Sequence, residues 1–295
     1  MEMDYAIIAS DIMKKYKGFT LDIPNCRIPK GFATALIGEN GAGKTTLLNI
    51  LAGIRLDYKG HVSYFDERES DVEKVKERFG YTGTGCFFLP HWTIRQVREV
   101  SSLLFDNFDA GRYDALCAEL GIGGGDLNKK ISSLSDGNRM KLILASVLAR
   151  DTECLLMDEP ASPLDPLMRD RLCSLIHEYL AAGDGSRSVL FSTHNISDME
   201  NVTDYCIIIE HGAIVEEGFV EDLKEKYVLV KGEPNDAAAA KDILFSFSQT
   251  PYGFEGICLS ENMDRLAGMD ISLETPTLFQ ISVAVMKAST NIAFA

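Results

Sequence analysis

The nine residues from Gly38 to Thr46 combine glycines, one lysine and two hydroxyl side chains at a spacing that suits phosphate binding. They lie between two apolar runs, so the pattern predicts a strand, a glycine loop and a helix start. Backbone N–H groups of such a loop attract phosphate oxygens, and Lys44 can reach the β- and γ-phosphates while the Thr45 hydroxyl ligates Mg²⁺. The residues expected to contact a nucleoside triphosphate are Gly38, Asn40, Gly41, Ala42, Gly43, Lys44, Thr45 and Thr46.

Two adjacent acids form a second candidate group. The apolar run 154–157 ends in Asp158 and Glu159, and ligands of α/β sheets bind at the carboxyl ends of the strands. We expect Asp158 to hold Mg²⁺, directly or through water, and Glu159 to act as the base for the attacking water. Paired acids also occur at ordinary strand ends, so the catalytic interpretation depends on the glycine loop.

Strands and helices alternate around these groups. The expected elements are β segments over 1–66, helical pattern over 72–128, a helix at 139–150, a strand at 154–157, a helix at 166–180, a strand at 188–191 and two β segments near 205–215. Such alternation predicts an α/β fold with a mainly parallel sheet covered on both faces.

The pattern changes after about residue 228. A strand at 229–231, a helix at 235–247 and a helix starting near Thr277 predict a small α+β extension. We therefore expect two domains, residues 1–227 and a C-terminal accessory domain at 228–295.

The composition excludes several classes of protein. The 295 residues carry a net charge of −15, which disfavours a nucleic-acid partner. No apolar segment approaches the roughly 20 residues of a membrane span, and the N-terminus does not read as a secretory signal. Seven scattered cysteines without a C-x-x-C pair favour reduced thiols. These features predict a cytoplasmic protein.

Further motifs resemble those of ATP-binding cassette (ABC) proteins. The matching residues are Leu134-Ser135-Asp136-Gly137-Asn138 (signature motif), Asp165 (D-loop), His194 (switch histidine) and Tyr16 (adenine-stacking aromatic). Taken singly, Tyr16 is an ordinary strand aromatic and His194 an ordinary turn histidine. Their order and spacing favour the family, and the resemblance covers residues 3 to about 225.

The resemblance implies a P-loop NTPase with a RecA-like core and a helical ABC subdomain at about 82–150. It implies ATP and Mg²⁺ as cofactors and Glu159 and His194 as catalytic residues. Two cassettes of this family pair head to tail, so Ser135 and the Gly137 amide of one chain cover the γ-phosphate held by the other. A helix N-terminus suits that role. The intact motif set favours a homodimer.

Two positions depart from the family pattern. Asp136 replaces a glycine of the signature, where Asn138 also replaces the common glutamine, and Thr84 aligns with the Q-loop glutamine. A carboxylate near a triphosphate is unfavourable unless it points away or meets a base. Threonine is too short to span the distance that glutamine spans. Slow or tightly gated hydrolysis is therefore an expectation, although Lys44 and the other catalytic positions are intact.

The partner expected from the resemblance is a transmembrane permease that holds the chain on the inner face of the membrane. The segment 86–92 is rich in aromatic residues, which would suit an anchor for a permease helix; packing inside the helical subdomain is the alternative. The detailed pattern resembles ABC-2-type exporters of antibiotics and amphipathic peptides, and 274–278 is similar to the end of their accessory region. The alternative functions are a soluble ABC ATPase and a slow nucleotide switch.

Overall fold

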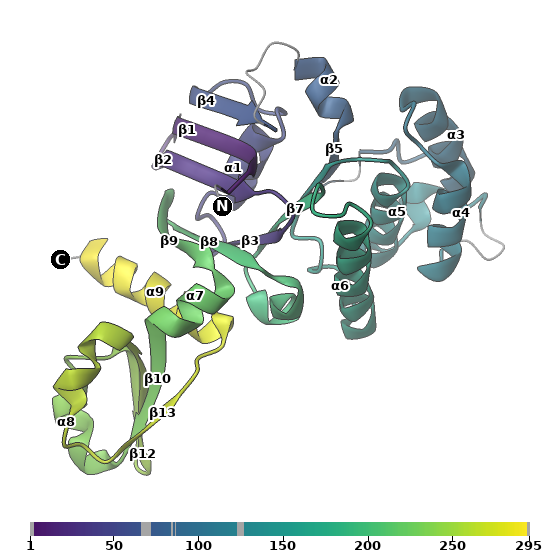
Figure 1. Ribbon diagram of the computed structural model, residues 1–295. Coiled ribbons are helices and arrows are strands. Elements are labelled where there is room, and N and C mark those ends of the chain that lie inside the picture. The colour runs from purple at the N-terminus through teal and green to yellow at the C-terminus, as the bar shows by residue number, and fades with distance from the viewer. Residues whose placement is uncertain (1–2, 66–71, 84, 86, 123–126, 294–295) are drawn as a thin grey trace.

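A six-stranded sheet forms the centre of the computed structural model, which describes residues 3–65, 72–83, 85, 87–122 and 127–293 (Figure 1). In spatial order its strands are β5 (Phe79–Thr82), β6 (Cys154–Asp158), β7 (Ser188–Thr193), β3 (Ala33–Ile37), β8 (Tyr205–Glu210) and β9 (Ala213–Phe219). The first five are parallel and β9 is antiparallel. Strands β3, β6 and β7 are buried along their whole length, as their continuous apolar runs predict.

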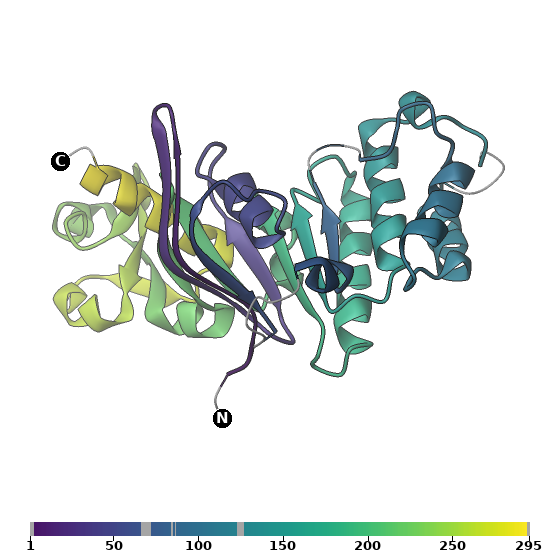
Figure 2. The same cartoon turned by 90° about the horizontal axis from the view of Figure 1, so that it is seen from above.

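A second, antiparallel sheet covers the N-terminal part of the core. It consists of β1 (Tyr5–Tyr16), β2 (Phe19–Pro29) and β4 (Lys59–Tyr64) in the order β2-β1-β4. Strands β1 and β2 form one long hairpin, visible in Figure 2. Its inner residues share a core cluster with α1 (Lys44–Leu51), so this sheet packs against the helix that follows the glycine loop.

Helices gather on one side of the central sheet, away from the C-terminal part of the chain (Figures 1 and 2). They are α3 (Ile94–Leu104), α4 (Ala110–Glu119) and α5 (Asp136–Leu148); α2 (Val72–Glu77) precedes β5, and α6 (Pro166–Ala181) follows β6. Side-chain caps start them locally, because Thr93, Asp109, Ser135 and Asp165 each accept a hydrogen bond from a first-turn N–H.

The C-terminal residues form a third sheet with short helices. The strands are β10 (Tyr227–Gly232), β11 (Phe245–Thr250), β12 (Gly253–Leu259) and β13 (Ile271–Glu274), in the order β11-β12-β10-β13; the helices are α7 (Val220–Lys226), α8 (Ala237–Ala240) and α9 (Leu278–Ala293). The prediction of a helix at 235–247 is wrong. Only the alanine run is helical as α8, because Phe245 pairs with Ile257 and begins β11.

Helix α9 returns from this sheet to the central one. Leu278, Ile281 and Ala284 are almost completely buried and belong to the same core cluster as Ile196 and Val202. None of the helices in the described part of the chain has the length and apolar character that crossing a membrane requires. The α/β fold expected from the sequence, with a P-loop core, a helical part and a C-terminal α+β part, is confirmed.

Candidate functional site

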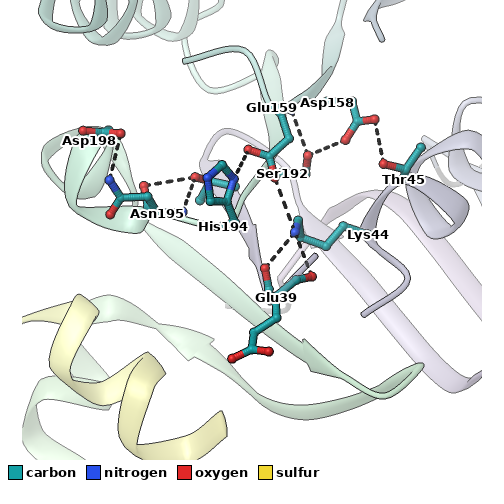
Figure 3. A network of polar contacts seen from close by, with 11 residues as sticks. Glu39, Lys44, Thr45, Asp158, Glu159, Ser192, His194, Asn195 and Asp198 are labelled. Atoms are coloured by element: carbon teal, nitrogen blue, oxygen red, sulfur yellow. Dashed lines mark hydrogen bonds and ion pairs between the residues drawn. The ribbon is translucent and has the colours of Figure 1, made fainter. Parts of the chain in front are cut away.

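The glycine loop joins the end of β3 to the first turn of α1, as its spacing predicts. Gly41 and Gly43 have φ angles of 92° and 112°, which favour glycine. A Cβ at Gly38 would lie 2.3 Å from the Ile209 carbonyl oxygen, so this position has no room for a side chain. Lys44 is buried, and its Nζ donates hydrogen bonds to Gly38 O (2.7 Å) and Glu39 O (3.1 Å) (Figure 3). The ammonium therefore lies across the mouth of the loop.

Asp158 ends β6 and is fully buried. Its Oδ2 accepts a hydrogen bond from Thr45 Oγ1 (2.8 Å), and its Oδ1 accepts one from Ser192 Oγ (2.6 Å). Parallel pairing sets Asp158 opposite Ser192, so neighbouring strands deliver both groups to one edge of the sheet. The carboxylate and the Thr45 hydroxyl are hard oxygen donors of the kind that Mg²⁺ prefers, and these residues fit that ion.

Glu159 has a backbone φ of 51°, a region that non-glycine residues adopt at an energetic cost. Its N–H donates a hydrogen bond to Ser192 Oγ (2.9 Å), which fixes the turn after β6. The Glu159 carboxylate lies between two basic side chains. Its Oε2 is 2.7 Å from His194 Nδ1, and its Oε1 is 3.4 Å from Lys44 Nζ. Buried Oε1 has no hydrogen-bond partner among the described residues. The geometry gives this oxygen capacity to accept a hydrogen bond.

The signature helix α5 begins against the D-loop of the same chain. Ser135 caps α5, and a Cβ at Gly137 would lie 2.9 Å from the carbonyl oxygen of Pro163, two residues before Asp165. Asp165 is exposed and caps α6 by accepting a hydrogen bond from the Met168 N–H (3.1 Å). Within the described residues, no hydrogen bond or ion pair joins Ser135, Gly137 or Asp165 to Lys44 or His194.

Asp136, the departure from the family signature, meets a base. Arg139 Nη1 lies 2.9 Å from Asp136 Oδ1, and Arg139 Nε donates to the Ile131 carbonyl (3.3 Å). Both residues line one cavity with Asp158 and Glu159. The unfavourable charge expected at Asp136 is therefore balanced within its own helix turn.

Tyr16 lies at the end of β1 and is 40% exposed. Its ring centroid is 6.2 Å from that of Phe19, whose ring limits the space at Gly43. Tyr16 is therefore near the glycine loop but separate from the polar network around Lys44. The Arg55 guanidinium lies over the ring, 5.6 Å from its centroid.

The Q-loop position, Thr84, lies outside the described residues, as does Cys86. In the aromatic segment that follows, Phe88 and Trp92 pack against the core, whereas Phe87 and Leu89 are 58% and 47% exposed. Phe88 and Trp92 thus follow the packing alternative, and the role of Phe87 and Leu89 as an anchor for a permease helix stays a prediction.

The structure brings together Lys44, Thr45, Asp158, Glu159 and His194 in one connected group (Figure 3). Sequence reasoning missed Ser192, which bridges Asp158 and the Glu159 backbone. The sequence shows only that Ser192 lies two residues before His194; that it faces Asp158 depends on the pairing of β6 with β7. Sequence reasoning also missed Arg139 as the partner of Asp136.

Comparisons with known proteins agree with this geometry. The sequence profile of the ABC transporter family matches residues 21–162. An uncharacterised ABC transporter ATP-binding protein of Nostoc sp. is 28% identical over 278 residues, covering 89% of this chain and 82% of the relative. The tungstate uptake system ATP-binding protein of Peptoclostridium acidaminophilum is 30% identical over 224 residues, covering 72% and 99%. A dimeric bacterial ABC transporter cassette matches the fold with a TM-score of 0.62 at 20% identity, covering 72% of this chain and 98% of that one.

Proposed function

The chain belongs to the ABC transporter family of ATP-binding proteins and is an ATPase of that family. We propose that Glu159 is its catalytic base and that ATP hydrolysis by this chain drives a membrane transporter. The observation that carries the first proposal is the carboxylate of Glu159 between Lys44 and His194. A base must lie within hydrogen-bond reach of the water that it activates.

ATP binding would rearrange the contacts of Lys44. The phosphates are stronger partners for an ammonium than the carbonyls of Gly38 and Glu39 that it now contacts. As Lys44 turns to the phosphates, Glu159 loses its ion pair with Lys44 and keeps its contact with His194. Oε1 of Glu159 then accepts the proton of the water that attacks the γ-phosphorus, and the bond to the ADP oxygen breaks.

Thr45 and Asp158 are the residues proposed to hold Mg²⁺. The ion, when bound, would neutralise charge on the β- and γ-phosphates. Ser192 would keep Asp158 oriented, since it already donates a hydrogen bond to Oδ1.

We propose that two copies of the chain pair head to tail, so that Ser135 and the Gly137 amide of one copy face the nucleotide of the other. The start of α5 supports this because the first-turn N–H groups of a helix and its dipole attract an anion. A single copy would then lack half of each site.

Glu159→Gln tests the role of the base. The wild type should hydrolyse ATP, whereas the variant should lose about 10²- to 10⁴-fold in rate and accumulate as an ATP-bound dimer in size-exclusion chromatography. Lys44→Ala is the matched control and should neither hydrolyse ATP nor dimerise with it. Equal rates for the wild type and Glu159→Gln would remove Glu159 from the mechanism.

The transport proposal needs a permease. The exposed side chains of Phe87 and Leu89 support it, because apolar groups in a surface segment suit a protein partner. Purification of the tagged chain from detergent-solubilised cells should yield a polytopic membrane protein in stoichiometric amount. A soluble complex, or the chain alone, would favour a soluble ABC ATPase or a nucleotide switch.

We propose export of a peptide, antibiotic or similar amphipathic substrate, with the chain peripheral on the cytoplasmic face of the membrane. The support is the resemblance of the sequence pattern to ABC-2-type exporters and the similarity of 274–278 to the end of their accessory region. The tungstate relative is named as part of an uptake system, so import is the competing direction. Reconstituting the co-purified permease with this chain in vesicles would distinguish the two by the side on which substrate accumulates.

A further inference from the structure

We propose that Glu200 is a positioning residue: it ties the first turn of α9 to the segment that carries His194, so that the C-terminal helix holds the switch histidine in place. The inference rests on the catalytic role proposed above for the Glu159–His194 pair. It assigns a function to the contact between the C-terminal extension and the nucleotide site.

The segment after His194 is fixed by polar contacts on the side of α6. Asn195 Nδ2 donates a hydrogen bond to Asp198 Oδ2 (3.0 Å), and Asp198 Oδ1 lies 2.8 Å from Arg169 Nη1 of α6. The Asn195 N–H also donates to Thr193 Oγ1 (3.0 Å). Figure 3 shows Asn195 and Asp198 on the segment that follows His194. A shift of this segment would therefore move His194 relative to Glu159.

On its other side the same segment packs against α9. It forms two short 3₁₀ turns, Ile196–Asp198 and Glu200–Val202, whose apolar residues Ile196 and Val202 are at most 2% exposed. They share a core cluster with Leu278 and Ile281 of α9, both fully buried. Close packing transmits displacements, because a core has few voids to absorb them.

Glu200 joins the two pieces by one specific bond. Its Oε1 accepts a hydrogen bond from the Leu278 N–H (2.8 Å). At the helix start, the side chains of Thr277 and Gln280 each accept a hydrogen bond from the backbone N–H of the other. Glu200 accepts one from the Leu278 N–H, a first-turn donor that this pair does not bind. Leu278 is fully buried, so water cannot replace the carboxylate easily. A carboxylate at a helix N-terminus is also favoured by the helix dipole.

Helix α9 also contacts the C-terminal sheet, packing against β11 and β12 as well as against β8. A change in the accessory sheet can therefore reach the His194 segment through α9 and Glu200. We infer that the extension sets the rate of ATP hydrolysis through this contact, while the affinity for ATP is set elsewhere.

The test compares three substitutions in the full chain by steady-state ATP hydrolysis. Glu200→Ala should lower kcat about fivefold or more, the scale of a lost helix cap, and leave KM for ATP within about twofold. Glu200→Gln keeps an acceptor oxygen for the Leu278 N–H and should recover most of the rate. Glu221→Gln, at an exposed α7 position that pairs with Lys224, is the control and should match the wild type.

Further measurements separate positioning from folding. In the Glu159→Gln background, Glu200→Ala should form the ATP-bound dimer as the single variant does. If Glu200→Ala does not fold, Glu200→Asp, which shortens the carboxylate by one methylene, should show the same fall in kcat. A kcat within twofold of the wild type, a Glu200→Gln variant as slow as Glu200→Ala, or a loss confined to KM would overturn the inference. An inactive wild type would instead contradict the proposed function.

Discussion

At the residue scale, Asp136 shows how a departure from a family motif can be balanced nearby. The Asp136 side chain is 84% exposed at the start of α5, and its Oδ1 pairs with Arg139 one helical turn later. An exposed ion pair of this kind contributes little to stability. Its consequence is local charge: the pair presents a nearly neutral surface where an unpaired carboxylate would repel a triphosphate.

Arg139→Ala should therefore weaken ATP-driven pairing of two chains. The substitution leaves Asp136 unbalanced beside the phosphates of the partner copy, and we expect the apparent dissociation constant of the dimer to rise about five- to tenfold. Sedimentation of the Glu159→Gln protein with ATP, with and without Arg139→Ala, measures this dissociation constant. Asp136→Gly in addition should restore pairing, because the charge is then absent. A double variant as weak as Arg139→Ala alone would show that the arginine acts by itself.

Motif spacing was sufficient to predict which of Lys44, Asp158, Glu159 and His194 would meet, because each is fixed to the end of a strand or the start of a helix. It could not predict Ser192 or Arg139. Ser192 faces Asp158 only through the pairing of β6 with β7, a long-range register that a sequence does not display. The role of Arg139 depends on the direction of its side chain.

At the scale of elements, β9 carries a carboxyl group in an unfavourable setting. Glu217 is half-buried, and its Oε2 has no hydrogen-bond partner in the described part of the chain. Burial raises the pKa of Glu217, Glu216 adds to the rise and Arg27 opposes it. The folded state therefore binds this proton more tightly than the unfolded state does, and the charge costs stability once the pH rises through the elevated pKa.

Glu217→Gln should stabilise the fold at neutral pH by about 1 kcal/mol, the scale of a buried polar group without a partner. The gain should shrink as the pH falls through the raised pKa of Glu217, because the wild-type carboxyl then becomes protonated and neutral in the folded state. Urea unfolding at pH 7 and pH 4.5 measures the difference, with Glu221→Gln as an exposed control. A gain of the same size at both pH values would show that charge is not the cause.

Elements with clear periodicity were predicted well, and one local pattern misled. The alanine run 237–240 favoured a helix through 247, but pairing with β12 takes Phe245 into a strand. Local propensity lost to tertiary contacts there.

At the scale of the whole molecule, the proposed division into residues 1–227 and 228–295 places the C-terminal sheet apart from the central sheet, but the two parts share a hydrophobic core. The strands of the extension form their own sheet, whereas α9 packs beside β8 in the large core. The sequence indicated α9 through its apolar spacing after Thr277. That the helix turns back onto the His194 segment depends on contacts between residues about 80 positions apart, such as Glu200 and Leu278.

We propose that hydrolysis needs two copies of this chain, each completing the nucleotide site of the other. The direct measurement is the ATPase rate per chain over a hundredfold range of protein concentration, with ATP and Mg²⁺ in excess. The rate per chain should rise with protein concentration and then level off as dimers form. A rate per chain that stays constant on dilution, down to concentrations where only monomer is detected, would contradict it.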